Sequence, residues 1–115
     1  MPIRNWQFRI EDIIDAINKI ESYIQGISFQ TFKSSGITID AVIRNIEVIG
    51  EAANHIPLKI RKKYPDLPWE QMRGIRNIMV HEYFGVDFKI VWYTAKKHLN
   101  PLRNKLEELL LIENE

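Results

Sequence analysis

The sequence predicts an all-α protein, an up-and-down bundle of four to five helices. Apolar residues recur at three- and four-residue steps along most of the chain, and no segment alternates apolar and polar residues as a half-buried strand does. A length of 115 residues suits one domain over residues 1-115, with a core that needs neither a disulfide nor a metal for stability.

Two isoleucine-rich stripes define the first half of the chain. The first predicts a helix from Trp6 to about Gly26. A loop or one short turn follows, and a second stripe predicts a helix that includes Ile39 to Ala53. Thr38 or Asp40 is expected to cap that helix.

Three prolines and four cations interrupt the pattern in PLKIRKKYPDLP, residues 57–68. We expect a short helical turn there, a break, and then a helix with Pro68 at its first position. This helix should run through RNIMVHEYF, residues 76–84, and end at Gly85.

Two further helices are expected near the carboxyl end. Asp87 is a plausible start for a helix whose apolar stripe ends at Leu99. Asn100 followed by Pro101 resembles a cap and a first-turn proline, so a separate last helix should begin there.

The helix that contains RNIMVHEYF has one apolar side and one mixed side. A helical wheel places Met72, Ile75, Ile78 and Met79 together as the anchor. The opposite band contains hydrogen-bonding groups interspersed with apolar ones: Arg73, Arg76, Asn77, Val80, His81, Tyr83 and Phe84.

This mixture fits phosphodiester chemistry. Histidine changes protonation near neutral pH and serves as general acid or base, and a guanidinium holds phosphate with two parallel hydrogen bonds. Arg76 and His81 are five positions apart, so they diverge by roughly 140° and are suited to flank a groove. RNA cleavage needs two proton-transfer groups, and a two-fold homodimer would supply the second His81 together with an apolar partner surface.

A structural explanation accounts for the same residues without catalysis. A histidine in the last turn of a helix is favoured by the helix dipole, and Arg76 can pair with Glu82 or another carboxylate. From chemistry alone the spacing does not decide between these interpretations.

The full constellation resembles HEPN-domain proteins of the HepT type. RGIRNIMVHEYFGVD is similar to their signature, in which Arg, a polar residue, three further positions, His, any residue and Tyr follow in order. DAVIRNIEVIGEAANHIP, YPDLPWEQM and FKIVWYTAKKHLNPLRNKLEELL resemble the same family in type and order, so the similarity covers nearly the whole chain.

The resemblance implies a helical bundle that dimerises with its motif helices facing. It implies a metal-independent ribonuclease toxin, neutralised by a minimal nucleotidyltransferase antitoxin. Arg76 and His81 match the family's catalytic pair, Asn77 matches the polar residue that follows the arginine, and Tyr83 matches the tyrosine modified with AMP. Two alternatives stay open: a non-catalytic nucleotide-binding or docking subunit of the nucleotidyltransferase, and a plain structural dimer.

Composition limits the other classes of function. The chain has no cysteine, which excludes a thiolate metal site and a cysteine nucleophile and suits the cytoplasm. A net charge of +1 gives no global field for a polyanion, and no apolar run reaches the length of a membrane span. We expect no metal and no cofactor.

Several other residues allow two interpretations. Arg73 is predicted to bind substrate phosphate or to form an ion pair at the dimer interface. The cations Lys59, Arg61, Lys62 and Lys63 either guide RNA or cover the wet side of a short helix.

Acidic and aromatic side chains elsewhere in the chain have structural explanations. Glu47 and Glu51 fit an exposed ion-pair network with Arg44 better than a metal site. Trp6 and Trp92 are expected in the core, the position of Trp69 is left open, and His55 and His98 are expected on the surface or in packing.

Overall fold

The computed structural model describes residues 5–81 and 88–114, and of residues 76–81 it describes the backbone only. All regular structure in these residues is helical, which confirms the all-α prediction. The helices are α1 (Trp6–Ile24), α2 (Phe29–Ser34), α3 (Gly36–Asn54), α4 (Leu58–Lys63), α5 (Trp69–His81), α6 (Phe88–Tyr93), the π-helix η2 (Thr94–His98) and α7 (Leu99–Glu113).

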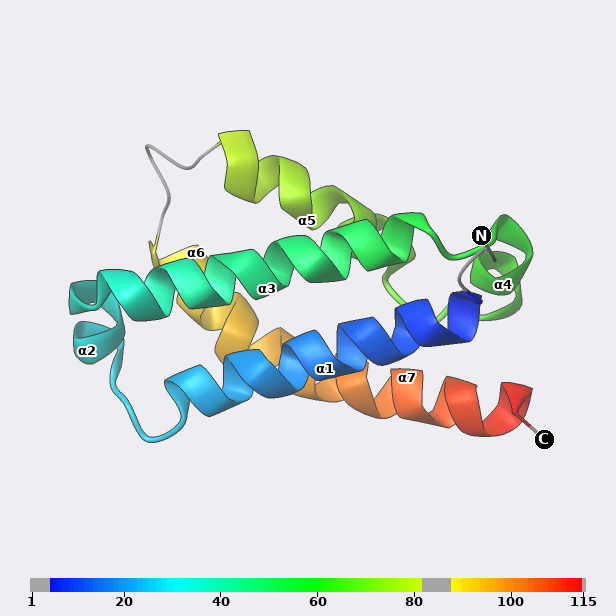
Figure 1. The fold of residues 1–115 in the computed structure, drawn as a ribbon, viewed down its shortest axis with the longest axis horizontal. Helices are drawn as coiled ribbons and strands as arrows, with labels where there is room; N and C mark the ends of the chain where they lie inside the picture. The colour runs from blue at the N-terminus through cyan, green and yellow to red at the C-terminus, as the bar shows by residue number, and fades with distance from the viewer. Residues whose placement is uncertain (1–4, 82–87, 115) are drawn as a thin grey trace.

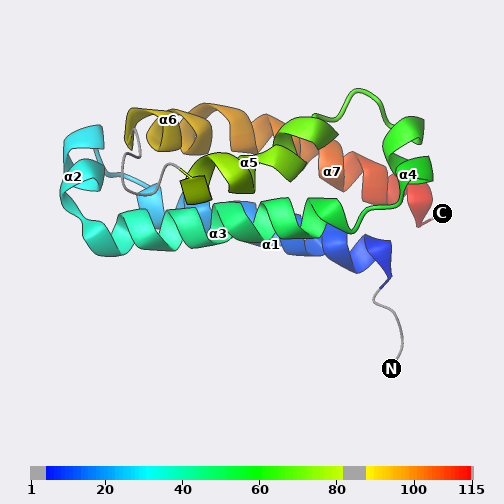
Figure 2. The same cartoon turned by 90° about the horizontal axis from the view of Figure 1, so that it is seen from above.

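The long helices α1 and α3 run in opposite directions and lie side by side (Figure 1). Helix α7 packs against α1, and α5 packs against α3 (Figures 1 and 2). The short helices α2 and α4 lie at opposite ends of this arrangement. The motif helix α5 therefore lies at the edge of the bundle, supported mainly by α3.

One hydrophobic core joins these helices. It takes one face of α1 and one face of α3, as their isoleucine stripes predict, and the apolar face of α7. The largest fully buried side chains are Phe32, Ile10, Ile13, Ile17, Ile20, Ile46, Ile49, Ile56, Leu106, Leu109, Val42 and Val91. Among the tryptophans, Trp6 and Trp92 pack partly buried against the core, whereas Trp69 is 5% exposed.

Serine, not Thr38 or Asp40, caps α3. The Ser35 hydroxyl accepts from the Thr38 backbone N–H at 3.2 Å, so α3 begins at Gly36, before its apolar stripe. The prediction was wrong because the helix extends beyond the residues that are buried, and burial was the signal used. Asn5 and Ser28 cap α1 and α2 in the same way.

The predicted break at Asn100 is also wrong, because helix runs without interruption from Phe88 to Glu113. In a regular α-helix the ring of Pro101 would collide with the carbonyl of Lys97, which would also lack an N–H partner. The π-helix over Thr94–His98 includes this carbonyl, and its wider turn accommodates the proline. Gly85 and Asp87, the other predicted boundaries, lie outside the described residues.

Candidate functional site on α5

The first half of α5 is fixed firmly to the bundle. The Pro68 carbonyl accepts from the Met72 N–H at 3.0 Å, so proline immediately precedes the first helical residue. The Trp69 ring is buried and its Nε1 donates to the Tyr64 carbonyl at 2.9 Å. Met72 is 3% exposed, and Ile75 packs against the core. These contacts set the direction in which α5 leaves the bundle.

The second half of α5 contains most of the candidate site. The backbone at Arg76, Asn77 and His81 is helical, as predicted. Five residues of α-helix give a rise of about 7.5 Å between Arg76 and His81 and a divergence of about 140°. The side chains of these three residues lie outside the described part of the structure, as does Tyr83 entirely. Their roles stay predictions.

Arg73, the predicted substrate-binding residue, has partners within its own chain. Its Nε donates to Asn54 Oδ1 at 3.1 Å, and its guanidinium lies 3.1 Å from Glu70 Oε1. The Arg61 guanidinium lies 3.8 Å from the same carboxylate oxygen. Arg73 thus ties α5 to the end of α3, while about a third of its side chain (34%) stays exposed. Spacing gave no sign of Asn54 as its partner.

A groove of about 770 Å³ separates the first half of α5 from the helical run α6–η2–α7. Most of its surface is apolar. It is lined by Ile49, Pro68, Glu70, Gln71, Met72, Gly74, Ile75, Ile90, Thr94, His98, Leu99 and Leu102. No local pattern in the sequence indicates this groove, because its walls come from three segments that are distant in the chain.

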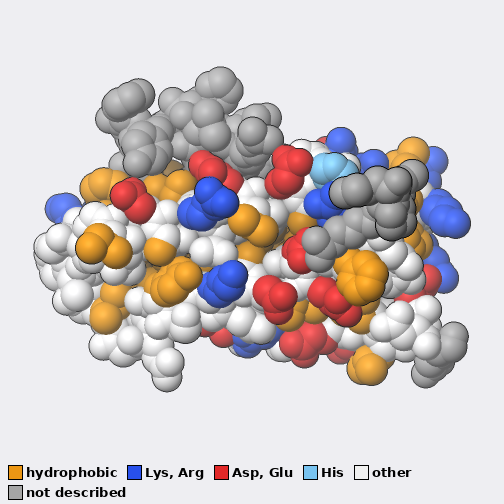
Figure 3. Space-filling view, in the orientation of Figure 1, with side chains coloured by type: hydrophobic (Ala, Val, Ile, Leu, Met, Phe, Trp, Pro, Cys, Tyr) orange, Lys and Arg blue, Asp and Glu red, His pale blue; other side chains and the backbone are white. Residues whose placement is uncertain are grey.

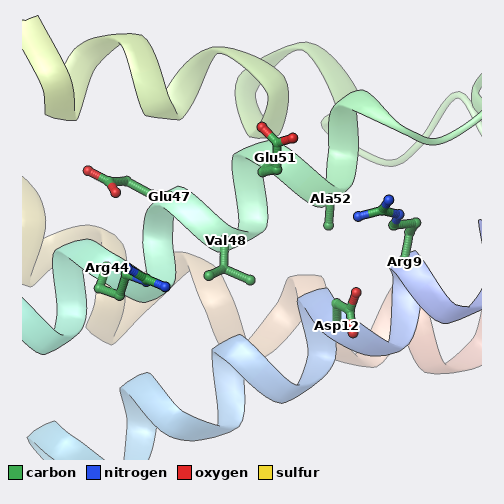
Figure 4. Close-up of a pocket in the computed structure, with 7 residues that line it drawn as sticks. All are labelled: Arg9, Asp12, Arg44, Glu47, Val48, Glu51 and Ala52. Carbon is green, nitrogen blue, oxygen red and sulfur yellow. The ribbon is translucent and has the colours of Figure 1, made fainter.

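A smaller hollow of about 270 Å³ lies between α1 and α3 (Figure 4). Val48 and Ala52 line it together with side chains of both signs: Arg9, Asp12, Arg44, Glu47 and Glu51. Arg9 and Arg44 extend toward one another along the hollow from opposite ends. The interspersed charges, also visible over the face in Figure 3, favour neither an anion nor a cation. Within the described residues, no three His, Asp or Glu side chains are grouped to hold a metal ion.

The basic run on α4 is partly occupied by internal contacts. Arg61 Nε donates to the Ile56 carbonyl at 3.2 Å, and Lys63 Nζ lies 2.7 Å from Glu113 Oε2. Lys59 and Lys62 are exposed and form no ion pair or hydrogen bond with any residue that the structure describes. Two of the four cations, Arg61 and Lys63, therefore connect α4 to other parts of the chain, and the other two lie at the surface.

The carboxylate of Glu113 joins α4 to the end of α7. It accepts hydrogen bonds from Lys63 and from the Tyr64 hydroxyl, and these bonds lower the pKa of Glu113. The same bond to Glu113 raises the pKa of Lys63, and the hydroxyl bond raises the pKa of Tyr64. All three shifts favour the same protonation state, with a charged lysine, a charged carboxylate and a neutral tyrosine.

The two remaining histidines lie outside the motif. His55 Nδ1 is 2.9 Å from the Glu51 carbonyl, and the side chain is exposed. His98 is exposed and packs edge-on against Tyr93, with ring centroids 5.3 Å apart. Both are surface residues, as predicted, but His98 also lines the groove beside α5.

The chain is similar over nearly its whole length to sequences that are named as ribonucleases. A family model described as "Ribonuclease HepT-like" matches residues 13–109. A probable ribonuclease HepT of Thermococcus cleftensis is 40% identical over 100 residues, which cover 87% of this chain and 91% of that protein.

Two further relatives share the same breadth of similarity. A putative RNase of Methanocaldococcus jannaschii is 34% identical over 110 residues, 96% of this chain and 91% of the relative. A putative RNase of Caldanaerobacter subterraneus is 34% identical over 101 residues, 88% of this chain and 90% of the relative. No solved structure matches the chain. In the part of the chain that the structure describes, no helix is long and apolar enough to span a membrane.

Proposed function

Since this chain belongs to the HepT-like ribonuclease family, we propose that it is a metal-independent endoribonuclease that acts as a homodimer. The observation that supports this most strongly is the order Arg76, Asn77, His81, Tyr83, which begins on the second half of α5. Similarity to named ribonucleases extends across the bundle that supports this helix.

The proposed reaction is an internal attack within RNA. His81 of one copy removes the proton from a 2′-hydroxyl, whose oxygen forms a bond to the adjacent phosphorus. The bond from phosphorus to the 5′-oxygen breaks, and His81 of the other copy protonates that leaving oxygen. Arg76 stabilises the charge on the remaining phosphorus oxygens, and Asn77 orients substrate or imidazole. The products are a 2′,3′-cyclic phosphate and a 5′-hydroxyl.

Dimerisation through α5 follows from the needs of this chemistry. The motif supplies one histidine for two proton transfers, so a second copy completes the cleft. The position of α5 at the edge of the bundle, supported mainly by α3 (Figure 1), is compatible with its second half meeting a partner. Below the dimer dissociation constant, the specific activity should fall in proportion to protein concentration.

The decisive experiment compares wild type with His81→Ala on RNA in excess EDTA. We expect cleavage by wild type, loss of at least about 100-fold in the variant, and a cyclic phosphate at the new end. His55→Ala is the matched control, because His55 is an exposed histidine outside the motif. Equal cleavage by wild type and His81→Ala would remove His81 from the mechanism, and loss of wild-type activity in EDTA would indicate a metal.

We further propose that the protein is a toxin controlled by a minimal nucleotidyltransferase antitoxin that attaches AMP to Tyr83. A phosphate on Tyr83 would compete with RNA for Arg76. Co-expression with the nucleotidyltransferase, followed by intact mass measurement, should show one or more AMP additions that are absent in Tyr83→Phe. An addition that persists in Tyr83→Phe would place the modification elsewhere. Reading the adjacent open reading frame tests whether such a partner is encoded there.

A further inference from the structure

The groove between α5 and η2 has the character of a binding site. Its volume of about 770 Å³ falls in the range of pockets that enclose small ligands, and apolar groups dominate its lining. Ile49 contributes from α3, Met72 and Ile75 from one wall, and Ile90 and Leu99 from the other. Ile90 is 54% exposed in the described structure, so the groove leaves apolar surface uncovered.

Gly74 is a second observation that points to an occupant. Glycine destabilises a helix interior relative to alanine, and Gly74 lies in the middle of α5. A Cβ added at this position meets no described atom within 4 Å, so packing among the described residues does not require glycine there. Gly74 lines the groove, where a missing side chain allows a ligand to approach the helix backbone closely.

The opposite wall contains the π-helix, an element that is rare and frequently located at functional sites. It brings Thr94 and His98 to the groove, which Gln71 and Gly74 of α5 also line. The Thr94 hydroxyl, the His98 imidazole and the Gln71 amide can each donate and accept hydrogen bonds. The carboxylate in the lining, Glu70, is paired with Arg73, which leaves neutral polar groups among apolar ones.

We propose that this groove binds one unpaired nucleobase of the RNA substrate; this rests on the proposed function. A nucleobase is flat and uncharged, with apolar faces and donor and acceptor groups on its edges, and it matches neutral polar groups on apolar walls. A phosphate would find no lysine or arginine among the groove residues. Ile75, a groove residue, immediately precedes Arg76 in α5, so the groove and the proposed catalytic residues lie on one helix and the bound base and the cleaved phosphate belong to one RNA strand.

A base that enters the groove must leave its Watson–Crick pair. The enzyme should therefore cleave single-stranded positions and spare the same sequence in a duplex. Gln71 and Thr94 then act as specificity-determining residues, because they face the edge of the base.

Nucleoside binding can be measured without cleavage. We would titrate the His81→Ala protein with adenosine, guanosine, cytidine and uridine and follow backbone amides by NMR. At least one nucleoside should shift the Gly74 and Thr94 amides and leave the Gly36 amide unmoved. Gly74→Leu should abolish these shifts by filling the groove. Gly36→Leu, the matched control at another helical glycine with open space around it, should preserve them.

The melting temperature of Gly74→Leu shows whether a loss of nucleoside binding comes from a filled groove or from an unfolded protein. Leucine favours helix more than glycine, so Gly74→Leu should melt no lower than wild type. If it does not fold, Thr94→Val serves instead, with a three- to ten-fold weaker nucleoside affinity expected for one lost hydrogen bond. In active protein, Gly74→Leu should raise KM for single-stranded RNA at least about ten-fold, with a smaller change in kcat.

Three results would overturn the proposal. One is the absence of any nucleoside-dependent shift at Gly74, even where RNA cleavage by wild type and its loss in His81→Ala uphold the proposed function. The second is unchanged nucleoside binding in Gly74→Leu, and dissociation of the dimer of this variant in sedimentation would then assign the groove to a second copy of the chain. The third is equal cleavage of single-stranded and duplex RNA.

Discussion

Replacing Trp69 with phenylalanine should loosen the attachment of α5 without touching its motif. The indole Nε1 donates to the Tyr64 carbonyl at 2.9 Å, and the ring is 5% exposed. The Leu67 N–H also donates to that carbonyl, at 3.2 Å, so the carbonyl keeps a partner in the variant. The lost bond should therefore destabilise the fold by about 1 kcal/mol and not by the larger amount expected for an unsatisfied group.

The smaller ring adds a second contribution. Phenylalanine buries about 30–40 Å² less than tryptophan, which corresponds to about 1 kcal/mol at about 25 cal/mol per Å². The sum is about 2 kcal/mol, or a decrease of about 1 M in the urea midpoint for a slope near 2 kcal/mol per M. Urea unfolding followed by circular dichroism would measure it, with an unchanged slope showing that the transition is still two-state.

Trp92→Phe is the matched control. Trp92 stacks on Phe32 with ring centroids 5.1 Å apart, and among the described residues its indole N–H has no hydrogen-bond partner. It should lose about 1 kcal/mol, from packing and from a weaker contact with Lys96 Nζ, which lies 5.0 Å from the Trp92 ring centroid. A Trp69→Phe variant that loses no more than Trp92→Phe would refute the stabilising role of the indole bond. At urea concentrations below its unfolding midpoint, Trp69→Phe should cleave RNA at the wild-type rate.

Three further variants test other parts of the structure. Leu106→Ala removes a fully buried side chain of α7 and should destabilise the protein by about 2–5 kcal/mol in urea unfolding. Because the pKa of Glu113 is lowered in the folded state, its stabilising effect is present above its unfolded pKa and lost as the pH falls through the folded one. Glu113→Gln should thus melt below wild type at neutral pH and level with it near pH 2, as calorimetry would show. Lys59→Gln combined with Lys62→Gln should reduce the slope of log affinity for RNA against log salt by about 1 to 2, measured with His81→Ala protein. An unchanged slope would mean that α4 does not contact RNA.

The sequence predicted the long helices because burial repeats along them. The isoleucine stripes of α1 and α3 match their buried faces. Helix α5 begins at Trp69, one residue after Pro68, which was predicted as its first position. Boundaries that do not depend on burial were missed. Ser35 caps α3 before its stripe begins, and the π-helix beside Pro101 keeps α6, η2 and α7 continuous. A single local rule for proline cannot distinguish a helix start from a proline tolerated by a wider turn.

Side-chain contacts between segments that are distant in the sequence cannot be predicted from local residue spacing. The residues around Arg73 on α5 do not indicate its partner Asn54, which lies 19 residues earlier and accepts a hydrogen bond from the guanidinium. The tie between Tyr64 and Glu113 spans 49 residues. Such contacts depend on how helices cross, and the same polar residue types at the same spacing also occur on faces with no partner.

The first half of α5 attaches the helix to the bundle, and the second half contains the proposed catalytic residues, so the two can be tested separately. Trp69, Met72 and Ile75 attach the first half to the bundle, while Arg76 and His81 follow on the second half. Trp69, which attaches the helix without lining the groove, should therefore change the free energy of unfolding when it is replaced and leave cleavage intact in folded protein. Substitutions of Arg76 or His81 should do the reverse. A helix of 13 residues is long enough for both only because its anchor occupies the first two turns.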